Sequence, residues 1–228
     1  MATHLDFPEL MATAERLFGI NNYLRFAVAP GKFADAIYQE GTLWVSNSEG
    51  YGIACGPRAN ALATWERYTL PREATAPDRS EIRGRWDFFA RSLILRESPA
   101  VPAVPATKTD LQIANFLEAH SPDSSVKPGD PEIQSWTTLL DQSGEISAVG
   151  AIVQWQSGEF CLASIATHTA QRGRGLATRL VTTMVERCEE LGARQVGLGV
   201  YAENYSAKRV YSKCGFTLMN EFTSYSRV

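Results

Sequence analysis

Apolar and polar positions along the chain follow their clearest pattern between residues 137 and 192. Apolar runs at Thr137–Asp141, Ala148–Trp155 and Phe160–Thr167, each followed by a short polar turn, predict three successive strands. From Leu176 onward, apolar residues recur every three or four positions, which is the spacing of one helix face. We therefore expect a long helix after the third strand, and Gly192 is a suitable residue to stop it.

Shorter elements flank this block. Thr109 and Asp110 can cap a helix whose apolar side reaches Leu117, and the polar, proline-rich stretch 121–131 that follows predicts a loop. Beyond the long helix the pattern predicts a strand, a helix stopped at Gly215 and two closing strands. These lie at Arg194–Val200, Asn204–Lys213, Phe216–Met219 and Glu221–Ser226.

The first 97 residues carry a weaker pattern. Phe7–Leu17 and Trp86–Leu95 are expected to be helices, and Thr42–Ser46 with Tyr51–Cys55 a hairpin. The Pro/Ala-rich segment 98–106 is either a linker or an edge strand, and we favour the edge strand because a helix follows at once. The sequence thus predicts two domains: a smaller N-terminal α/β module at 1–97 and a second domain at 98–228.

Composition narrows the function classes. The chain has 228 residues, 44% of them hydrophobic and 21% charged, with a formal net charge of -3. Such a charge supplies no basic field for nucleic acid, and no apolar run is long enough to span a membrane. The four cysteines are far apart, which disfavours a zinc site. We expect no metal, buried free thiols at Cys161 and Cys188, and a reduced, cytoplasmic protein.

Candidate chemistry begins where the third strand ends. An Arg-Gly-Arg-Gly turn at residues 172–175 opens the long helix. A helix start offers unpaired N–H groups and the positive end of the helix dipole, and glycines let a phosphate come close. A Rossmann fingerprint is incomplete because Thr178 stands at the third glycine position, and a P-loop would need Gly-Lys-Ser/Thr. A capped helix without a ligand is the remaining plain alternative.

Two motifs together resemble one family. Residues 172–177, Arg-Gly-Arg-Gly-Leu-Ala, are similar to the Arg/Gln-x-x-Gly-x-Gly/Ala signature of the GNAT superfamily of acyl-CoA-dependent N-acyltransferases. Residues 204–216 are similar to its Asn-x-x-Ala-x-x-x-Tyr-x-x-x-Gly-Phe segment, and 104–117 to its first strand and helix. The resemblance covers about residues 98–228. It implies an α/β (α+β) GNAT fold, with a mixed central sheet, a splayed strand pair and flanking helices, preceded by the smaller N-terminal module, which could be a degenerate GNAT-like half.

The resemblance also implies a cofactor site. Acetyl-CoA would be the cosubstrate, with its pyrophosphate on the N–H groups at the start of the long helix and its pantetheine arm along the preceding strand. Arg172 and Arg174 could bind phosphate, although Arg174 could equally be solvated. Asn204 would bind the cofactor, cap its helix, or do both. The implied cofactor-binding residues are Ile165, Ala166, Thr167, Arg172, Gly173, Arg174, Gly175, Leu176, Ala177, Thr178 and Asn204.

The implied catalytic residue is Tyr211, as general acid to the thiolate of coenzyme A. The alternative is a structural role, in which Tyr211 is a tyrosine that packs its helix against the rest of the protein. Many family members carry a glutamate base five positions before the asparagine, and here that position is Gly199. Glu203, His168, a carboxylate of the first region or water could replace it, and a turn role is favoured for His168. Gly197 and Gly199 either allow close backbone approach or form a bulge.

The expected function is transfer of an acetyl group from acetyl-CoA to a primary amine of a small molecule, peptide or protein. The alternative is a non-catalytic acyl-CoA-binding regulatory module. We expect no nucleic-acid or membrane partner, and either a monomer or a homodimer. Residues 1–97 could cover the acceptor cleft.

Overall fold

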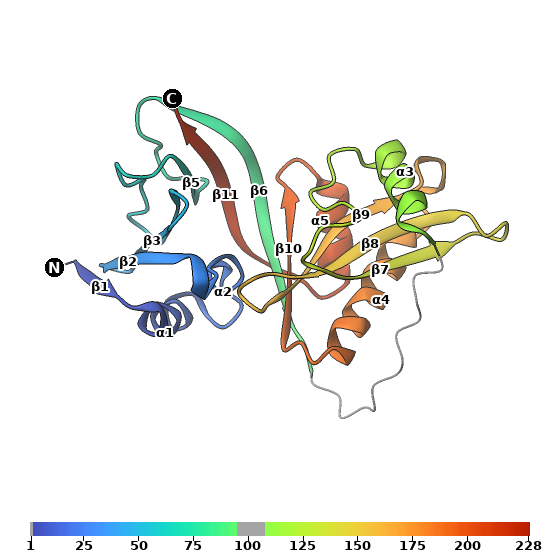
Figure 1. Ribbon diagram of the computed structural model, residues 1–228, viewed down its shortest axis with the longest axis horizontal. Coiled ribbons are helices and arrows are strands. Elements are labelled where there is room, and N and C mark those ends of the chain that lie inside the picture. The colour runs from blue at the N-terminus through green and yellow to red at the C-terminus, as the bar shows by residue number, and fades with distance from the viewer. Residues whose placement is uncertain (1, 95–107) are drawn as a thin grey trace. The chain divides into compact units, whose positions relative to one another are not determined.

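The computed structural model describes residues 2–94 and 108–228 (Figure 1). The chain divides into two compact units that interleave along the sequence. Unit 1 consists of Met1–Ala90, Gly199–Tyr205 and Leu218–Val228, and unit 2 of Arg91–Leu198 and Ser206–Thr217. The expected linker or edge strand at 98–106 lies outside the described residues.

Unit 1 begins with a short strand and two helices and continues mainly as strands. Its helix α1 has a capping box in which Asp6 accepts the N–H of Glu9 at 2.9 Å and Glu9 accepts the N–H of Asp6 at 3.0 Å. Its elements are β1 (Thr3–Leu5), α1 (Phe7–Phe18), α2 (Tyr23–Ala27), the 3-10 turn η1 (Pro30–Lys32), β2 (Phe33–Gln39), β3 (Thr42–Asn47), β4 (Tyr51–Cys55), β5 (Arg67–Pro71), β6 (Ser80–Ser92) and, from the far end of the chain, β11 (Thr217–Arg227).

Strand β11 completes the sheet of unit 1. The strand order is β1-β2-β3-β4-β5-β11-β6, so the last strand of the chain is inserted between two strands of its first half. It is antiparallel to β5, with Ser224 opposite Thr69 and Tyr225 opposite Tyr68. Phe222 is fully buried in this unit. The expected pair of closing strands is thus one long strand.

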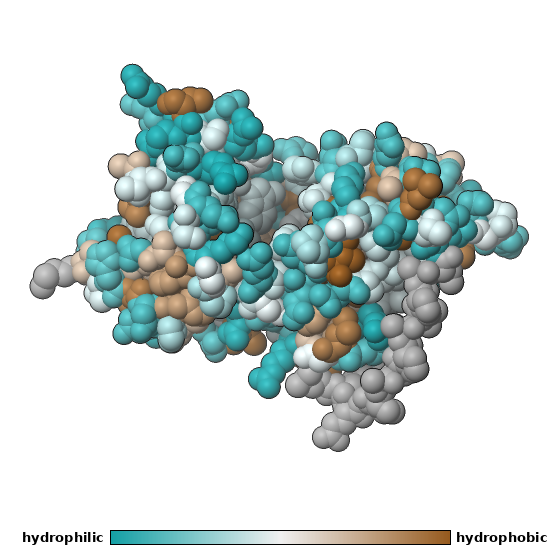
Figure 2. All heavy atoms as spheres, in the orientation of Figure 1, coloured by the Kyte–Doolittle hydropathy of each residue, from teal (hydrophilic) through white to brown (hydrophobic). Residues whose placement is uncertain are grey.

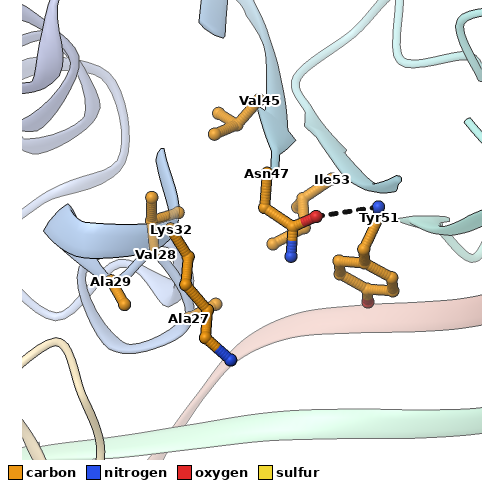
Figure 3. A pocket seen from close by; sticks show the side chains of 8 residues that line it. All are labelled: Ala27, Val28, Ala29, Lys32, Val45, Asn47, Tyr51 and Ile53. Atoms are coloured by element: carbon orange, nitrogen blue, oxygen red, sulfur yellow. Dashed lines mark hydrogen bonds between the residues drawn. The ribbon is translucent and has the colours of Figure 1, made fainter. Parts of the chain in front are cut away.

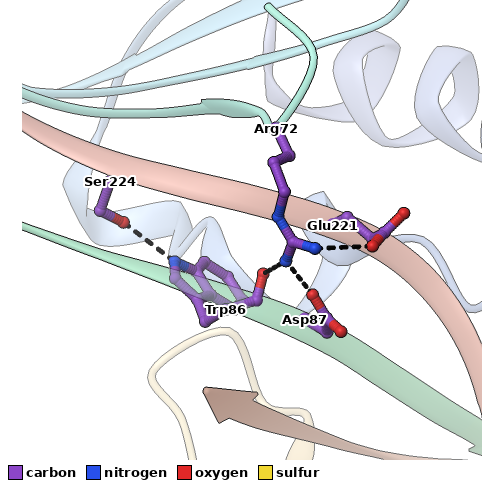
Figure 4. A network of polar contacts seen from close by, with 5 residues as sticks. All are labelled: Arg72, Trp86, Asp87, Glu221 and Ser224. Atoms are coloured by element: carbon purple, nitrogen blue, oxygen red, sulfur yellow. Dashed lines mark hydrogen bonds and ion pairs between the residues drawn. The ribbon is translucent and has the colours of Figure 1, made fainter. Parts of the chain in front are cut away.

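Of the segment expected to be a helix at Trp86–Leu95, residues 86–92 belong instead to strand β6. The expectation of a helix was wrong there, because a run of large apolar residues is compatible with both the helix period and the strand period. Only the pairing with a neighbouring strand decides between them. Asp87 is fully buried on one side of the strand, where Arg72 binds its Oδ1 (Figure 4). The same guanidinium donates to the carbonyl oxygen of Trp86 at 3.2 Å and to Glu221 Oε1 at 2.7 Å.

Unit 2 has the second set of strands and the longer helices. Helix α3 begins after Thr109, whose side chain accepts the N–H of Gln112 at 3.3 Å, as expected for a capping residue. The elements are α3 (Asp110–His120), β7 (Ile133–Leu140), β8 (Ile146–Gln154), β9 (Phe160–Thr167), η2 (Thr169–Gln171), α4 (Leu176–Glu190), β10 (Gln195–Tyr201) and α5 (Tyr205–Lys213). Strands β7, β8 and β9 are antiparallel, and β10 is parallel to β9.

Helix α4 packs on β7, β8 and β9 through the apolar face that the sequence predicts, and its buried residues are Leu180, Val181, Met184, Val185 and Cys188. Gly150 of β8 allows this close packing. A Cβ built there would lie 2.6 Å from the Met184 sulfur, so a larger residue would displace the end of the Met184 side chain. The three expected strands and the long helix are confirmed, with boundaries displaced by a few residues at most.

The two units share one order of strand pairing. In unit 1, β2, β3 and β4 are antiparallel and β5 is parallel to β4, just as β10 follows β7–β9 in unit 2. Unit 1 has no helix after β4 or after β5, since residues 56–66 and 72–79 are turns and irregular chain. Unit 1 therefore has no counterpart of α4, and so no helix start at the end of its β4.

The visible surface is mostly hydrophilic, with apolar residues in small separate patches (Figure 2). No helix within the described residues is long and apolar enough to cross a membrane. All four cysteines are buried free thiols, as expected for Cys161 and Cys188. No cluster that could hold a metal ion occurs within residues 2–94 and 108–228.

Candidate acyl-CoA site

Strands β9 and β10 separate soon after they pair. Their ladder consists of two residue pairs, Val196 with Phe160 and Gly197 with Cys161. Strand β9 runs on to Thr167, paired with β8 on its other side. The ladder therefore ends well before β9 does, and the backbone groups of Ile165, Ala166 and Thr167 lie on the part of β9 beyond it.

A bulge interrupts β9 at Ser164. The register with β8 changes between Ala163 and Ala166, and Ser164 has a φ of 50°, in the left-handed region. Its hydroxyl donates to the carbonyl oxygen of Val126 at 2.7 Å and accepts the N–H of Val126 at 3.1 Å. The loop between α3 and β7 is thereby attached to the bulge. Glycine would be the usual signal for this backbone conformation, so the sequence pattern did not reveal the site.

The glycine turn has the conformation that an anion site needs. Gly173 and Gly175 have φ values of 79° and 78°, and apart from neighbouring residues in the chain no protein atom lies within 4 Å of the place where either Cβ would be. Their backbone conformation therefore calls for glycine, and the space beside them is open. Gly175 is the N-cap of α4 and supplies no side-chain cap, and the first turn contains no acidic residue. The N–H groups of Leu176, Ala177 and Thr178 belong to this first turn, where a helix has no internal partners for them.

The turn is held to α3. Arg172 donates from Nη2 to the carbonyl oxygen of His120 at 3.0 Å, the last residue of α3. The His120 and His168 rings are 4.2 Å apart, and Thr169 N–H donates to His120 Nδ1 at 3.4 Å. Burial, followed by the charges of His168 and Arg172, lowers the pKa of His120, which favours the neutral ring that can accept that bond. This link joins residues 52 apart in sequence, beyond the reach of local patterns.

His168 has the turn role that the sequence favours. Its Nδ1 accepts the N–H of Ala170 at 3.3 Å and its backbone carbonyl accepts Gln171 N–H at 2.9 Å. The arginine between the two glycines, Arg174, is exposed and makes no ion pair within the described residues. Of the two arginines, Arg172 has a structural partner and Arg174 is available for phosphate.

Residues 105–216 match the family model of the acetyltransferase (GNAT) family. The chain therefore contains a GNAT acetyltransferase domain. A curated relative, the uncharacterized N-acetyltransferase YdgE of Bacillus subtilis, is 40% identical over 57 residues, which cover 25% of this chain and 36% of that protein. The matched segment is thus about a third of the relative's length.

Solved structures agree on the GNAT fold. A putative GNAT acetyltransferase from Novosphingobium aromaticivorans has a TM-score of 0.53 at 17% identity, with 81% of this chain and 88% of that chain covered. A GNAT acetyltransferase from Colwellia psychrerythraea has a TM-score of 0.51 at 11% identity and covers 100% of both chains. At these identities the likeness concerns the fold, and it confirms the predicted fold class.

In the GNAT domain, Tyr211 is buried on α5, 6% exposed. Burial, with a smaller contribution from Cys214, raises its pKa well above the ordinary tyrosine value. One turn later, Cys214 Sγ lies 3.7 Å from the carbonyl oxygen of Thr178, in the first turn of α4. The helix that carries the candidate proton donor therefore contacts the helix that begins at the glycine turn.

Asn204 stands immediately before α5, in the N-cap position, and its N–H donates to the carbonyl oxygen of Tyr201 at 3.0 Å. It belongs to unit 1, as do Gly199 and Glu203. Gly199 is exposed on β10 and has an ordinary backbone conformation. A Cβ built there would touch the Trp86 ring at 3.7 Å.

A separate pocket lies within unit 1 (Figure 3). It encloses about 340 Å³, including open solvent, between the α2–β2 segment and strands β3 and β4. Lys32, Asn47 and Tyr51 are its polar residues, and Lys32 pairs with Glu49 at 2.9 Å. None of the residues expected to bind the cofactor lines it, so it is distinct from the glycine turn.

Proposed function

We propose that the protein is an acetyl-CoA-dependent N-acetyltransferase that acts on a primary amine of a small molecule, peptide or protein. The observation that carries this proposal is the glycine turn between β9 and α4. Two left-handed glycines border open space at a helix start without an acidic residue, directly after a strand that has parted from its neighbour. That combination fits a phosphate at the turn and an extended arm along β9.

The thioester of the cosubstrate supplies the activated acetyl group. In direct attack, the neutral amine nitrogen bonds to the carbonyl carbon, the C–S bond breaks, the nitrogen loses a proton to water, and the leaving sulfur gains one. Tyr211 would supply the hydrogen bond or proton to that sulfur. Because burial raises its pKa, the phenol stays protonated and acts best as a hydrogen-bond donor to the developing thiolate.

The proposed cofactor residues are those that the sequence indicates, with roles refined by the structure. The N–H groups from Gly173 to Thr178 would bind pyrophosphate, Arg174 would add charge, and Arg172 would hold the turn in place through His120. Ile165, Ala166 and Thr167 would bind the arm, and Asn204 would combine capping with cofactor binding.

Unit 1 is proposed to derive from a GNAT-like half that has lost its cofactor helix. Its pairing order supports this proposal, and the turns after β4 in place of a helix support a single cofactor site. A cytoplasmic location is proposed on the basis of the four buried free thiols.

Calorimetric titration with coenzyme A, combined with thiol release from acetyl-CoA over a panel of amines, tests the function. Micromolar binding and amine-dependent release are expected. The second candidate, a non-catalytic acyl-CoA-binding module, is favoured by one observation, the absence of a side-chain base at Gly199. Binding of coenzyme A without thiol release for any amine would support it.

A further inference from the structure

The pocket within unit 1 has apolar walls (Figure 3). Its buried wall residues are Val28, Val45 and Ile53, each no more than 6% exposed, and Ala27 and Ala29 complete the wall. All the residues that line the pocket belong to unit 1, and none of them is acidic. An apolar pocket with a few polar groups suits a small ligand that has a hydrocarbon part and one polar head.

The Asn47 side chain offers hydrogen-bond donors to this pocket. Its Oδ1 accepts the backbone N–H groups of Glu49 at 2.9 Å and Tyr51 at 2.8 Å. Because two N–H donors use both lone pairs of the oxygen, they also fix which end of the amide is the nitrogen. Figure 3 shows that nitrogen pointing into the space between Lys32 and Tyr51. It has no hydrogen-bond partner within residues 2–94 and 108–228.

The Tyr51 hydroxyl is the end of a row of hydrogen bonds. It lies 2.5 Å from Thr69 Oγ1, which lies 2.8 Å from Ser224 Oγ. Trp86 Nε1–H donates to Ser224 Oγ at 2.9 Å, and an indole can only donate. When Ser224 donates to Thr69 and Thr69 to Tyr51, the inner hydroxyl protons are used and the surplus proton is that of Tyr51, at the pocket. Burial raises the pKa of Tyr51, so the phenol retains this proton.

Lys32 supplies a positive charge to the same pocket. Its ammonium pairs with Glu49 Oε1 at 2.9 Å, and the two side chains are 40% and 52% exposed. A pair exposed to this extent is screened by water and contributes little to stability. The ammonium has three N–H donors, of which Glu49 takes one. Lys32 can therefore bind a second anion while Glu49 stays in place.

We propose that this pocket is a binding site for a short aliphatic carboxylate. Its two oxygens accept hydrogen bonds from Lys32, Asn47 and Tyr51, which come from η1, β3 and β4, and its hydrocarbon chain lies against the apolar wall. An ammonium group would find three donors and no acidic lining residue there. The pocket is distinct from the glycine turn, so this inference goes beyond the proposed acetyl transfer and does not depend on it.

The test compares pentanoate with pentanamide and pentan-1-amine, whose five-carbon chains carry a negative, a neutral and a positive head group at about pH 7. Calorimetric titration of the full chain measures binding, and the NMR signals of the Asn47 side-chain amide locate it. We expect a Kd of about 1 mM or lower for pentanoate, an affinity at least about tenfold weaker for pentanamide, and no saturable binding of the amine. Equal affinities for the three compounds, no saturation by pentanoate, or unchanged Asn47 signals would overturn the proposal.

Charge variants complete the test. Lys32→Met removes the charge and keeps an apolar side chain, and should weaken pentanoate binding about tenfold or more. Lys213→Met is the matched control, because Lys213 is exposed on α5 in unit 2 and the net charge changes equally. Equal losses in both variants would show a non-specific charge effect and overturn the site.

Glu49→Gln tests the same point through a gain of affinity, which an unfolded variant cannot produce. It removes the carboxylate that competes for the Lys32 ammonium and should strengthen pentanoate binding about two- to threefold. Tyr51→Phe removes the hydroxyl and should weaken binding by about the same factor. Weaker binding to Glu49→Gln than to the wild type would contradict the role of Lys32.

Discussion

The hydroxyl of Ser164 accepts a hydrogen bond from the N–H of Val126 and donates one to its carbonyl oxygen. One side chain thus satisfies both backbone polar groups of a buried residue in the α3–β7 loop. Ser164→Ala removes both bonds and retains a Cβ at a φ of 50°. We expect a loss of about 2–4 kcal/mol in stability, from two unsatisfied backbone groups. Ser164→Gly loses the same bonds without the steric cost and should be about 1 kcal/mol more stable than the alanine variant. Urea denaturation of both variants measures the difference, and equal midpoints would contradict the backbone strain.

Gly173→Ala probes the proposed phosphate turn. A Cβ at a φ of 79° is strained and would enter the open space beside the N–H groups of α4. We expect the Kd for coenzyme A to rise about tenfold or more, which corresponds to about 1.4 kcal/mol. Gly158→Ala is the matched control, because Gly158 has a φ of 87°, lies equally in open space and is in the β8–β9 turn. Equal losses of affinity in both variants would argue against a phosphate site at Gly173.

Tyr211→Phe should lower kcat about 10²-fold or more with little change in the Kd for coenzyme A. The proton on the phenol is retained to high pH because burial raises its pKa, so the wild-type rate should show no alkaline decline from Tyr211 below about pH 10. Stopped-flow thiol release over this pH range provides the measurement. An unchanged kcat in the phenylalanine variant would exclude the proposed role.

The same shift in pKa predicts an effect on stability. A pKa raised on folding means that the unfolded chain loses its proton first, so the contribution of Tyr211 is complete below about pH 10 and is lost as the pH rises above that value. Tyr211→Phe should therefore flatten the decline in melting temperature at alkaline pH. Scanning calorimetry of both proteins tests the sign, and a steeper decline in the variant would contradict it.

Asp87 and Glu221 share Arg72 but differ in burial, 0% and 50% side-chain exposure respectively. Asp87→Ala leaves the Arg72 guanidinium without its buried partner and should cost about 3–5 kcal/mol. Glu221→Gln removes an exposed pair and should cost less than about 1 kcal/mol. Thermal melts of both variants distinguish the two environments.

The local sequence pattern was sufficient to predict much of the secondary structure of unit 2. The helix period of α4 and the glycines at 173 and 175 lie in consecutive residues, so the turn and the helix could be located together. The hydrogen bonds from Arg172 to His120 and between Ser164 and Val126 join segments that are distant in the sequence, and no residue type in the sequence predicts them. In unit 1, the helix expected at Trp86–Leu95 was wrong for residues 86–92 of β6, because the partner strand β11 lies more than 120 residues further along the chain, beyond the reach of local patterns.

The position of β11 has a consequence for biosynthesis. Strands β5 and β6 leave the ribosome while their shared neighbour, Thr217–Arg227, has still to be translated. During that interval both strands present open backbone edges, and Phe222 is missing from beside Trp86. Unit 1 can therefore reach its final form only after residues 217–227 have left the ribosome, and a nascent chain stalled before residue 217 would be a natural client for chaperones.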